Sequence, residues 1–361
     1  MVRAMKVVSV VGARPQFIKC APVSCELRQV AQEVLVHTGQ HYDDSMSGVF
    51  FRELGLPEPD YHLAVGSGSH GHQTGEMLKK IEEILLKEEP DVVLVYGDTN
   101  STLAGSLAAA KLHIPVAHVE AGLRSYNRKM PEEINRVLTD HLSALLLCPT
   151  ETAVENLRRE GVTKGVHLVG DVMYDALLDG VEIARRTSTI LDRLAIEPQR
   201  YILATVHRAE NTDQPQRLEG IVTALVGLAK AGHRVVFPVH PRTQKELSLH
   251  SIELCEGVVQ IDPVSYLDMV LLESMARVIL TDSGGIQKEA YWLQVPCLTL
   301  RDETEWEETV QSGWNRLVGT DPQRILRAVE EAGPGSGTGR SWKKGEASRN
   351  VARLIGECRP D

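Results

Sequence analysis

The chain has 361 residues, of which 42% are hydrophobic and 24% are charged, a composition typical of folded globular proteins. At roughly 150 residues per domain, this length predicts two domains, each large enough to bury its own core. The 39 basic and 49 acidic side chains give a net charge of −10, which argues against nucleic-acid and anionic-membrane partners because both need a basic surface.

Residues 1–172 alternate short β-branched runs with segments of helical period. The predicted strands are Val7–Val11, Val34–His37, Val92–Tyr96, Val116–Val119, Leu145–Cys148 and Val166–Val169, and the predicted helices include Met77–Lys87, Leu103–Leu112 and Thr152–Glu160. The strands are apolar throughout, which is typical of parallel strands covered on both faces. The pattern therefore predicts an α/β domain with a doubly wound, Rossmann-like sheet.

The same rhythm restarts in residues 173–345, after a charged helical stretch at 173–194. The predicted strands are Tyr201–Val206, Arg234–Val239, Val258–Ile261, Val278–Thr281, Cys297–Leu300 and Leu317–Val318, and the predicted helices include Arg217–Lys230, Tyr266–Glu273 and Ile286–Leu293. A mobile surface loop is expected at 333–339, and an amphipathic helix at about 346–361 could pack back onto the first domain. Two such domains predict a central cleft between facing strand ends, where open α/β sheets bind ligands.

The first strand is followed by Gly12-Ala13-Arg14-Pro15-Gln16-Phe17-Ile18-Lys19. A Rossmann dinucleotide loop would carry Gly-x-Gly-x-x-Gly here, and its absence argues against NAD. Arg14 in the loop and Lys19 one helical turn later instead predict an anion clamp at a helix N-terminus. The alternative is that both cations are simply solvated.

Carboxylates follow the next strands of the same domain. Asp98 comes directly after one predicted strand and Glu120 after the next, and Glu132 opens a helix behind Pro131 with Arg136 one turn on. Asp98 could instead cap its helix, and acidic residues in a first helical turn also complement the helix dipole. Several carboxylates meeting in one crevice would favour general acid–base catalysis.

The second domain carries a matching polar set at its strand ends. His207 follows the first strand of this half. Ser283, Gly284 and Gly285 join a later strand to a helix, which predicts a phosphate cradle formed by free backbone N–H groups. Glu289 lies further along that helix, at a distance suited to a sugar hydroxyl.

No metal site and no membrane segment is predicted. His37 and His41, like His70 and His72, lack a compact third ligand. No apolar run approaches the roughly 18 residues of a membrane span, and Val7–Val11 is too short for a signal peptide. The six cysteines form no Cys-x-x-Cys pair, which predicts reduced thiols in a cytoplasmic protein.

With these motifs, the sequence resembles the non-hydrolysing UDP-N-acetylglucosamine 2-epimerase family. The resemblance covers nearly the whole chain through eight segments in order: GARPQFIK, HTGQHYD, YGDTNSTLAG, HVEAGLRS, MPEEINR, HRAEN, HPRT and DSGGIQKEA. It implies a GT-B fold, a UDP-sugar substrate, a homodimer, no redox cofactor and a role in making cell-envelope polysaccharides. By motif match it assigns catalysis to Asp98, Glu120, Glu132 and His207, and substrate binding to Arg14, Lys19, Arg136, Ser283, Gly284, Gly285 and Glu289.

The resemblance implies reversible inversion of C2 in UDP-N-acetylglucosamine, giving UDP-N-acetylmannosamine by elimination of UDP and its re-addition to 2-acetamidoglucal. Two departures point to a related substrate. Gln16 stands where the family usually has glutamate, and Trp306 stands where many members have arginine. Both are similar to the branch that acts on UDP-2,3-diacetamido-2,3-dideoxy-glucuronate.

Two further classes compete with an epimerase. A GT-B glycosyltransferase would share both domains but needs one base and an acceptor groove, so three carboxylates favour the epimerase. A catalytically inactive nucleotide-sugar binder would not need the carboxylates at all.

Overall fold

The computed structural model describes residues 5–40, 51, 53–337 and 343–358. The chain divides into two compact units. Unit 1 comprises residues 1–179 and 342–361, and unit 2 comprises residues 180–341.

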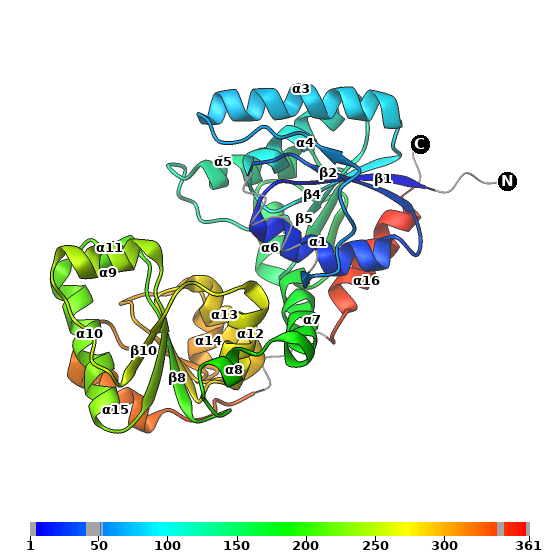
Figure 1. Cartoon of the computed structure of the whole chain (residues 1–361). Coiled ribbons are helices and arrows are strands. Elements are labelled where there is room, and N and C mark those ends of the chain that lie inside the picture. The colour runs from blue at the N-terminus through cyan, green and yellow to red at the C-terminus, as the bar shows by residue number, and fades with distance from the viewer. Residues whose placement is uncertain (1–4, 41–50, 52, 338–342, 359–361) are drawn as a thin grey trace. The chain divides into compact units, whose positions relative to one another are not determined.

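Unit 1 is built on a seven-stranded parallel sheet in the order β3-β2-β1-β4-β5-β6-β7. Its elements are β1 (Lys6–Val11), α1 (Arg14–Leu27), β2 (Gln32–His37), β3 (Tyr61–His62), α3 (His70–Glu88), β4 (Val92–Tyr96), α4 (Asn100–Lys111), β5 (Val116–Val119), α5 (Pro131–Leu142), β6 (Leu145–Cys148), α6 (Glu151–Arg159), β7 (Val166–Leu168), the first half of α7 (Val172–Thr187) and α16 (Glu346–Glu357). Helices α3, α4 and α5 lie on one face of the sheet, and α1 and α16 lie on the other (Figure 1).

Unit 2 is built on a six-stranded parallel sheet in the order β10-β9-β8-β11-β12-β13. Its elements after α7 are α8 (Ile190–Arg193), β8 (Tyr201–Thr205), α9 (Ala209–Thr212), α10 (Pro215–Lys230), β9 (Arg234–Pro238), α11 (Pro241–Leu249), β10 (Val258–Ile261), α12 (Tyr266–Met275), β11 (Val278–Thr281), α13 (Gly284–Leu293), β12 (Cys297–Thr299), α14 (Glu307–Gln311), β13 (Asn315–Leu317) and α15 (Pro322–Glu331). Helix α10 packs with α9 and α15, whereas α13 packs with α12 and α14.

Both sheets confirm the predicted α/β class with doubly wound parallel sheets, because strand order reverses around the first strand of each unit. Strand β3 was not predicted, since it has only two residues and no apolar run. The two units meet within α7, after Asp179, whereas the sequence suggested a boundary at residue 172. The predicted loop at 333–339 lies partly outside the described residues.

The C-terminal helix α16 packs against α1. Val351 and Ile355 on its inner face are fully buried. The buried carboxylate of Asp175 on α7 accepts hydrogen bonds from the backbone N–H groups of Gly345 (2.6 Å) and Ser348 (2.8 Å), so it caps the start of α16. Among the described residues, no helix is both long and apolar enough to cross a membrane.

The strand order fixes where ligands are expected. In unit 1 the order reverses at β1 and β4, and in unit 2 at β8 and β11. Doubly wound sheets bind ligands beyond the carboxyl ends of the strands at this switch point. The predicted functional residues follow these strands.

Candidate active site

Asp98 and Glu120 follow neighbouring strands of unit 1. Strands β4 and β5 are parallel, and Tyr96 pairs with Val119 at their ends. The N–H of Gly97 donates to the carbonyl oxygen of Val119 (3.0 Å), which keeps the two exits together. Glu120 has a φ of +71°, a left-handed conformation that costs a non-glycine residue about 1–2 kcal/mol. The tertiary structure therefore holds this carboxylate in a strained backbone, as is common at functional sites.

Lys19 of α1 forms an ion pair with Glu120. A Cβ placed on Gly97 would lie 3.3 Å from Glu120 Oε2 and 3.5 Å from Lys19 Nζ, so the pair lies directly over this glycine. Burial lowers the pKa of Lys19, but Glu120, with smaller help from Asp98, outweighs burial and raises it overall. The ammonium is therefore charged, and it is held against a carboxylate.

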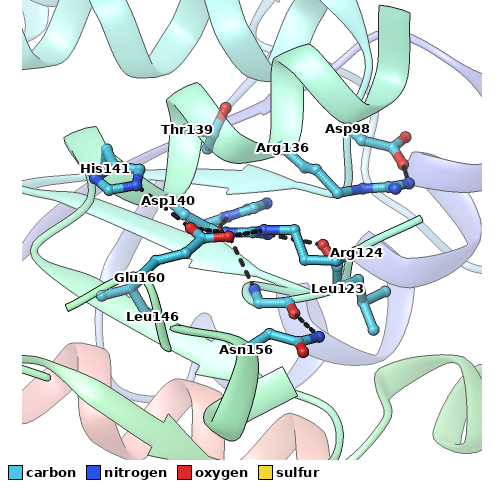
Figure 2. Close-up of polar contacts among 12 residues, drawn as sticks. Asp98, Leu123, Arg124, Arg136, Thr139, Asp140, His141, Leu146, Asn156 and Glu160 are labelled. Atoms are coloured by element: carbon cyan, nitrogen blue, oxygen red, sulfur yellow. Dashed lines mark hydrogen bonds and ion pairs between the residues drawn. The ribbon is translucent and has the colours of Figure 1, made fainter. Parts of the chain in front are cut away.

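Arg136 of α5 links Asp98 to Glu133. One guanidinium nitrogen pairs with Asp98, as Figure 2 shows, and the other is 2.6 Å from Glu133 Oε2. Burial lowers the pKa of Arg136, but both carboxylates outweigh it and the pKa is raised. Glu132, the predicted member of the pair, is exposed on the first turn of the helix. Its neighbour Glu133 is buried and braces Arg136.

Helix α5 has an unusual distribution of side chains. Pro131 at its first turn and the two glutamates behind it are a typical helix start. The residues that it buries are polar, namely Glu133, Asn135, Thr139 and Asp140. Asn135 Nδ2 donates to the carbonyl oxygen of Asp98 (3.0 Å), so the helix holds the backbone as well as the side chain of that residue. The buried face of α5 thus serves the site rather than the hydrophobic core.

Gln16 is buried between β1 and β4 and uses all of its hydrogen-bonding positions. Its Oε1 accepts from the N–H groups of Gly12 (2.8 Å) and Ala13 (3.1 Å). Its Nε2 donates to the carbonyl oxygen of Tyr96 (2.8 Å) and to Thr102 Oγ1 (3.0 Å). Because a glutamate carboxylate has no donor for the last two, the amide suits this position. Arg14, two residues earlier, is exposed at the start of α1.

In unit 2, Asp282 joins the two predicted segments. This carboxylate is fully buried and accepts from the backbone N–H groups of His207 (3.1 Å) and Arg208 (3.0 Å). It also accepts from Asn211 Nδ2 (3.1 Å). Because Asp282 directly precedes Ser283, it fixes the His207 loop beside the start of α13.

His207 has one face toward solvent and its Nδ1 3.4 Å from Asp282 Oδ1. Burial is the main cause that lowers the pKa of His207; Asp282 opposes it, and His240 and Arg208 add to it. The ring of His240 lies 5.6 Å away between centroids. Unliganded, His207 is therefore neutral near pH 7.

The N-terminus of α13 is where the sequence predicts a phosphate cradle. Ser283 caps the helix by accepting from the N–H of Ile286 (3.4 Å). Gly285 is exposed, and a Cβ placed on Gly284 would lie 2.5 Å from Glu305 Oε1 and 3.4 Å from Trp306 Nε1. The glycine thus permits the 305–306 segment to approach closely.

Glu289 lies on the next turns of α13 and is half-buried. Beneath it is Glu273, whose carboxyl is fully buried. Burial, with the charge of Glu289, raises the pKa of Glu273 well above its usual range. The Glu273 carboxyl therefore favours its protonated form more strongly than an ordinary glutamate does.

The structure thus groups the predicted residues within each unit. Unit 1 brings together Lys19, Asp98, Glu120 and Arg136. The predicted residues Arg14 and Glu132 are exposed, on the first turns of the helices that carry Lys19 and Arg136. Unit 2 brings His207 and the 283–285 turn to one sheet edge. The sequence prediction missed Asn135, Asp140 and Asp282, since their roles depend on partners distant in the chain.

In the part of the chain that the structure describes, no group of three His, Cys, Asp or Glu side chains could hold a metal ion. His41 of the His37–His41 pair lies outside the described residues. His70 begins α3, and its Nδ1 is 3.2 Å from Asn100 Nδ2, which accounts for this histidine structurally.

A family model described as UDP-N-acetylglucosamine 2-epimerase matches residues 24–356. The chain is 57% identical over 352 residues to a UDP-N-acetylglucosamine 2-epimerase homolog of Methanococcus maripaludis, covering 96% of this chain and 98% of the relative. It is 49% identical over 361 residues to the UDP-2,3-diacetamido-2,3-dideoxy-D-glucuronate 2-epimerase of Pseudomonas aeruginosa, covering 97% and 99% respectively.

The fold is also that of a solved relative. The crystal structure of the Methanocaldococcus jannaschii UDP-GlcNAc 2-epimerase in complex with UDP-GlcNAc and UDP matches with a TM-score of 0.80 at 43% identity. The match covers 98% of this chain and all of the other. These findings confirm the predicted GT-B type.

Proposed function

The chain belongs to the UDP-N-acetylglucosamine 2-epimerase family, and from that premise we propose that it reversibly inverts C2 of UDP-N-acetylglucosamine to give UDP-N-acetylmannosamine. The observation that carries this proposal is the arrangement in unit 1. Asp98 and Glu120 leave adjacent strands at one sheet edge, each paired with a cation. An epimerase needs at least two acid–base groups, one for each face of C2, whereas a glycosyltransferase needs one base.

The chemistry explains why several carboxylates are required. The C2 hydrogen of the sugar is barely acidic, and the nitrogen on C2 prevents oxidation to a ketone. Breaking the anomeric C–O bond gives C1 oxocarbenium character, which acidifies the C2 hydrogen. The C1–O electron pair leaves with UDP while a carboxylate takes the C2 proton, leaving 2-acetamidoglucal. Protonation of C2 from the opposite face and re-addition of UDP to C1 complete the inversion.

We assign unit 2 the departing diphosphate. Ser283, Gly284 and Gly285 present backbone N–H groups at the start of α13, where a helix dipole favours anions. His207 is neutral when unliganded. The negative charge of a bound diphosphate would raise its pKa and favour the protonated ring. Glu289 suits the ribose hydroxyls. These groups stabilise negative charge that develops on UDP during elimination.

We assign unit 1 the proton transfers. Asp98, Glu120 and Glu132 share the roles of base and acid on the two faces of C2. Lys19 and Arg136 form ion pairs with Glu120 and Asp98 and so hold the two carboxylates in place. The exposed Arg14 adds a cation for the diphosphate.

The test is incubation of the protein with UDP-N-acetylglucosamine alone in heavy water. Deuterium at C2 of recovered substrate and product supports the proposal, because the proton returns from solvent. Unchanged substrate without deuterium refutes it and favours the transferase. Release of free N-acetylmannosamine and UDP would instead identify a hydrolysing enzyme, because the intermediate then escapes.

A second substrate has specific support. The relative that acts on UDP-2,3-diacetamido-2,3-dideoxy-D-glucuronate is 49% identical over nearly the whole chain, and Gln16 and Trp306 depart from the usual pattern. The reaction at C2 would be the same. Comparing kcat/KM for the two UDP-sugars decides which is the natural substrate.

We also propose a homodimer. Helix α5 exposes apolar side chains: Met130 just before it and Ile134 and Leu138 on it are 38%, 47% and 47% exposed, and Tyr126 nearby is 66% exposed. An apolar stripe spaced by four residues on one helix suits a two-fold contact with a second copy. Sedimentation should give a dimer for the native chain and a monomer for Ile134→Glu/Leu138→Glu.

The thiols support a cytoplasmic setting. None of the six cysteines lies in a disulfide. Burial raises the pKa of Cys148 and Cys297 to about 12, so these two thiols stay protonated and unreactive. Fractionation of producing cells should place the protein with cytoplasmic markers.

A further inference from the structure

Asp140 of α5 fixes the backbone and side chains around Glu120. This carboxylate is fully buried. It accepts from His118 Nδ1 (2.7 Å), the N–H of Gly122 (3.0 Å) and Arg124 Nη1 (2.6 Å). These partners lie two residues before Glu120 and two and four residues after it. One side chain on another element therefore grips both sides of the strained residue.

His118 extends this grip to the neighbouring strand. It is fully buried in β5, and its Nε2 lies 2.7 Å from the carbonyl oxygen of Gly97, the residue before Asp98. Both neighbours of the ring are acceptors, a carboxylate and a carbonyl. The ring satisfies both only by donating from both nitrogens.

Arg124 closes the arrangement on the far side. Its Nη1 bonds Asp140, while Nε and Nη2 donate to the two oxygens of Glu160 at 2.7 and 2.8 Å. Figure 2 shows Arg124, Asp140 and Glu160 in one connected row, with Arg136 and Asp98 beyond it. Burial raises the pKa of Asp140, but His118 and Arg124 outweigh burial and the pKa is lowered.

We propose that His118 and Asp140 are positioning residues that hold the Gly97-Asp98 and Glu120 segments in register for proton transfer at C2. The proposal rests on the proposed function for its catalytic consequence. Neither residue need touch the substrate. Gly97 is tied to β5 at both ends, by its N–H to Val119 and by its carbonyl to His118, so His118 fixes the direction in which Asp98 leaves the strand.

The geometry predicts that the two ends of the imidazole have separable effects. The side-chain amide of asparagine can reach the place of Nδ1, and that of glutamine can reach the place of Nε2. His118→Asn should keep the bond to Asp140 and lose the bond to Gly97, whereas His118→Gln should keep the bond to Gly97. Misplacing a reacting group by about 1 Å costs up to about 100-fold in rate.

The experiment compares His118→Asn, His118→Gln and Asp140→Asn with the native protein. Asp175→Asn is the matched control, since Asp175 is an equally buried aspartate of unit 1 that accepts two backbone bonds at the start of α16. For each variant we would measure kcat, KM, melting temperature, and amide hydrogen exchange in peptides covering 97–101 and 119–124.

We expect His118→Asn to lower kcat by about 10- to 100-fold with KM within about threefold, and to speed exchange in the 97–101 peptide. His118→Gln should recover most of the kcat at a similar melting temperature. Asp140→Asn should speed exchange in 119–124, and Asp175→Asn should change neither peptide nor kcat.

Two results would overturn the proposal: His118→Asn with native kcat, or equal kcat and exchange for the asparagine and glutamine variants. If the native protein turns over neither UDP-sugar, the proposed function fails by itself. The exchange measurement then decides whether His118 and Asp140 hold the two segments, because it does not depend on turnover.

Discussion

Gly97→Ala tests the claim that the Lys19–Glu120 pair must lie directly over the tip of β4. Gly97 has a φ of +63°, so alanine there costs about 1–2 kcal/mol of strain. The new Cβ would lie 3.3 Å from Glu120 Oε2 and 3.5 Å from Lys19 Nζ. These atoms end flexible side chains, so they can move by a few tenths of an ångström without unfolding the protein.

Gly161→Ala separates the strain from the displacement. Gly161 has a φ of +80°, and a Cβ there meets nothing within 4 Å. Both variants should therefore lose about 1–2 kcal/mol, or about 2–8 °C in the melting temperature of a unit of this size. Only Gly97→Ala should lose activity, by about 10-fold or more in kcat, since the carboxylate moves.

The assay is the rate of C2 epimerisation with saturating substrate, together with thermal unfolding of each variant. Equal activity of the two alanine variants would refute the reasoning, because it would mean that the ion pair tolerates the added methyl group. Loss of activity in Gly161→Ala would also refute it, because strain alone would then explain the effect.

Three other perturbations give distinct results. Gly122→Ala places a Cβ 2.3 Å from the carbonyl oxygen of Ala153 at a φ of +78°. Backbone strain and overpacking should together lower the unfolding free energy, measured in urea, by about 3 kcal/mol. A loss of stability no greater than that of Gly161→Ala would contradict this. Because the pKa of Asp140 is lowered from its ordinary value of 3.8, its carboxylate stabilises folding fully above that value, and this contribution is lost as the pH falls below it. Below about pH 4 the unfolding free energy should therefore drop more steeply in the native chain than in Asp140→Asn. Parallel curves for the two proteins would argue against the ionised network. The lowered pKa of His207 predicts that UDP affinity rises as the pH falls below about 6.5. His207→Gln should retain only the pH dependence of UDP itself. Identical plots of UDP affinity against pH for the native chain and His207→Gln would exclude a role for His207 in diphosphate binding.

Much of the fold could be predicted because its signals are local. Strands β4, β5, β6, β10 and β11 match their predicted ranges, since each is a short run made mostly of apolar residues. The ends of β4, β5 and β8 are followed by Asp98, Glu120 and His207, at the edge of a parallel sheet where ligands bind.

The remainder of the site depends on contacts that no spacing reveals. The apolar residues Ile134 and Leu138 would ordinarily be expected to face the core. Helix α5 instead exposes both of them and buries Asp140. His118 and Asp140 are 22 residues apart in the sequence. Likewise, a sequence pattern does not distinguish Glu132 from Glu133. Only the structure of the helix shows that Glu133 is the one that pairs with Arg136.

The crossing at α7 and the return at α16 make unit 2 an uninterrupted stretch and unit 1 a divided one. During synthesis, unit 2 can finish folding as soon as residue 341 has left the ribosome. Unit 1 can finish folding only later, because α1 stays uncovered until α16, with its buried Val351 and Ile355, has been synthesised and packs against it. A fragment ending at residue 341 should therefore have a folded unit 2 and an aggregation-prone unit 1. Residues 180–341 can be expressed as one continuous piece.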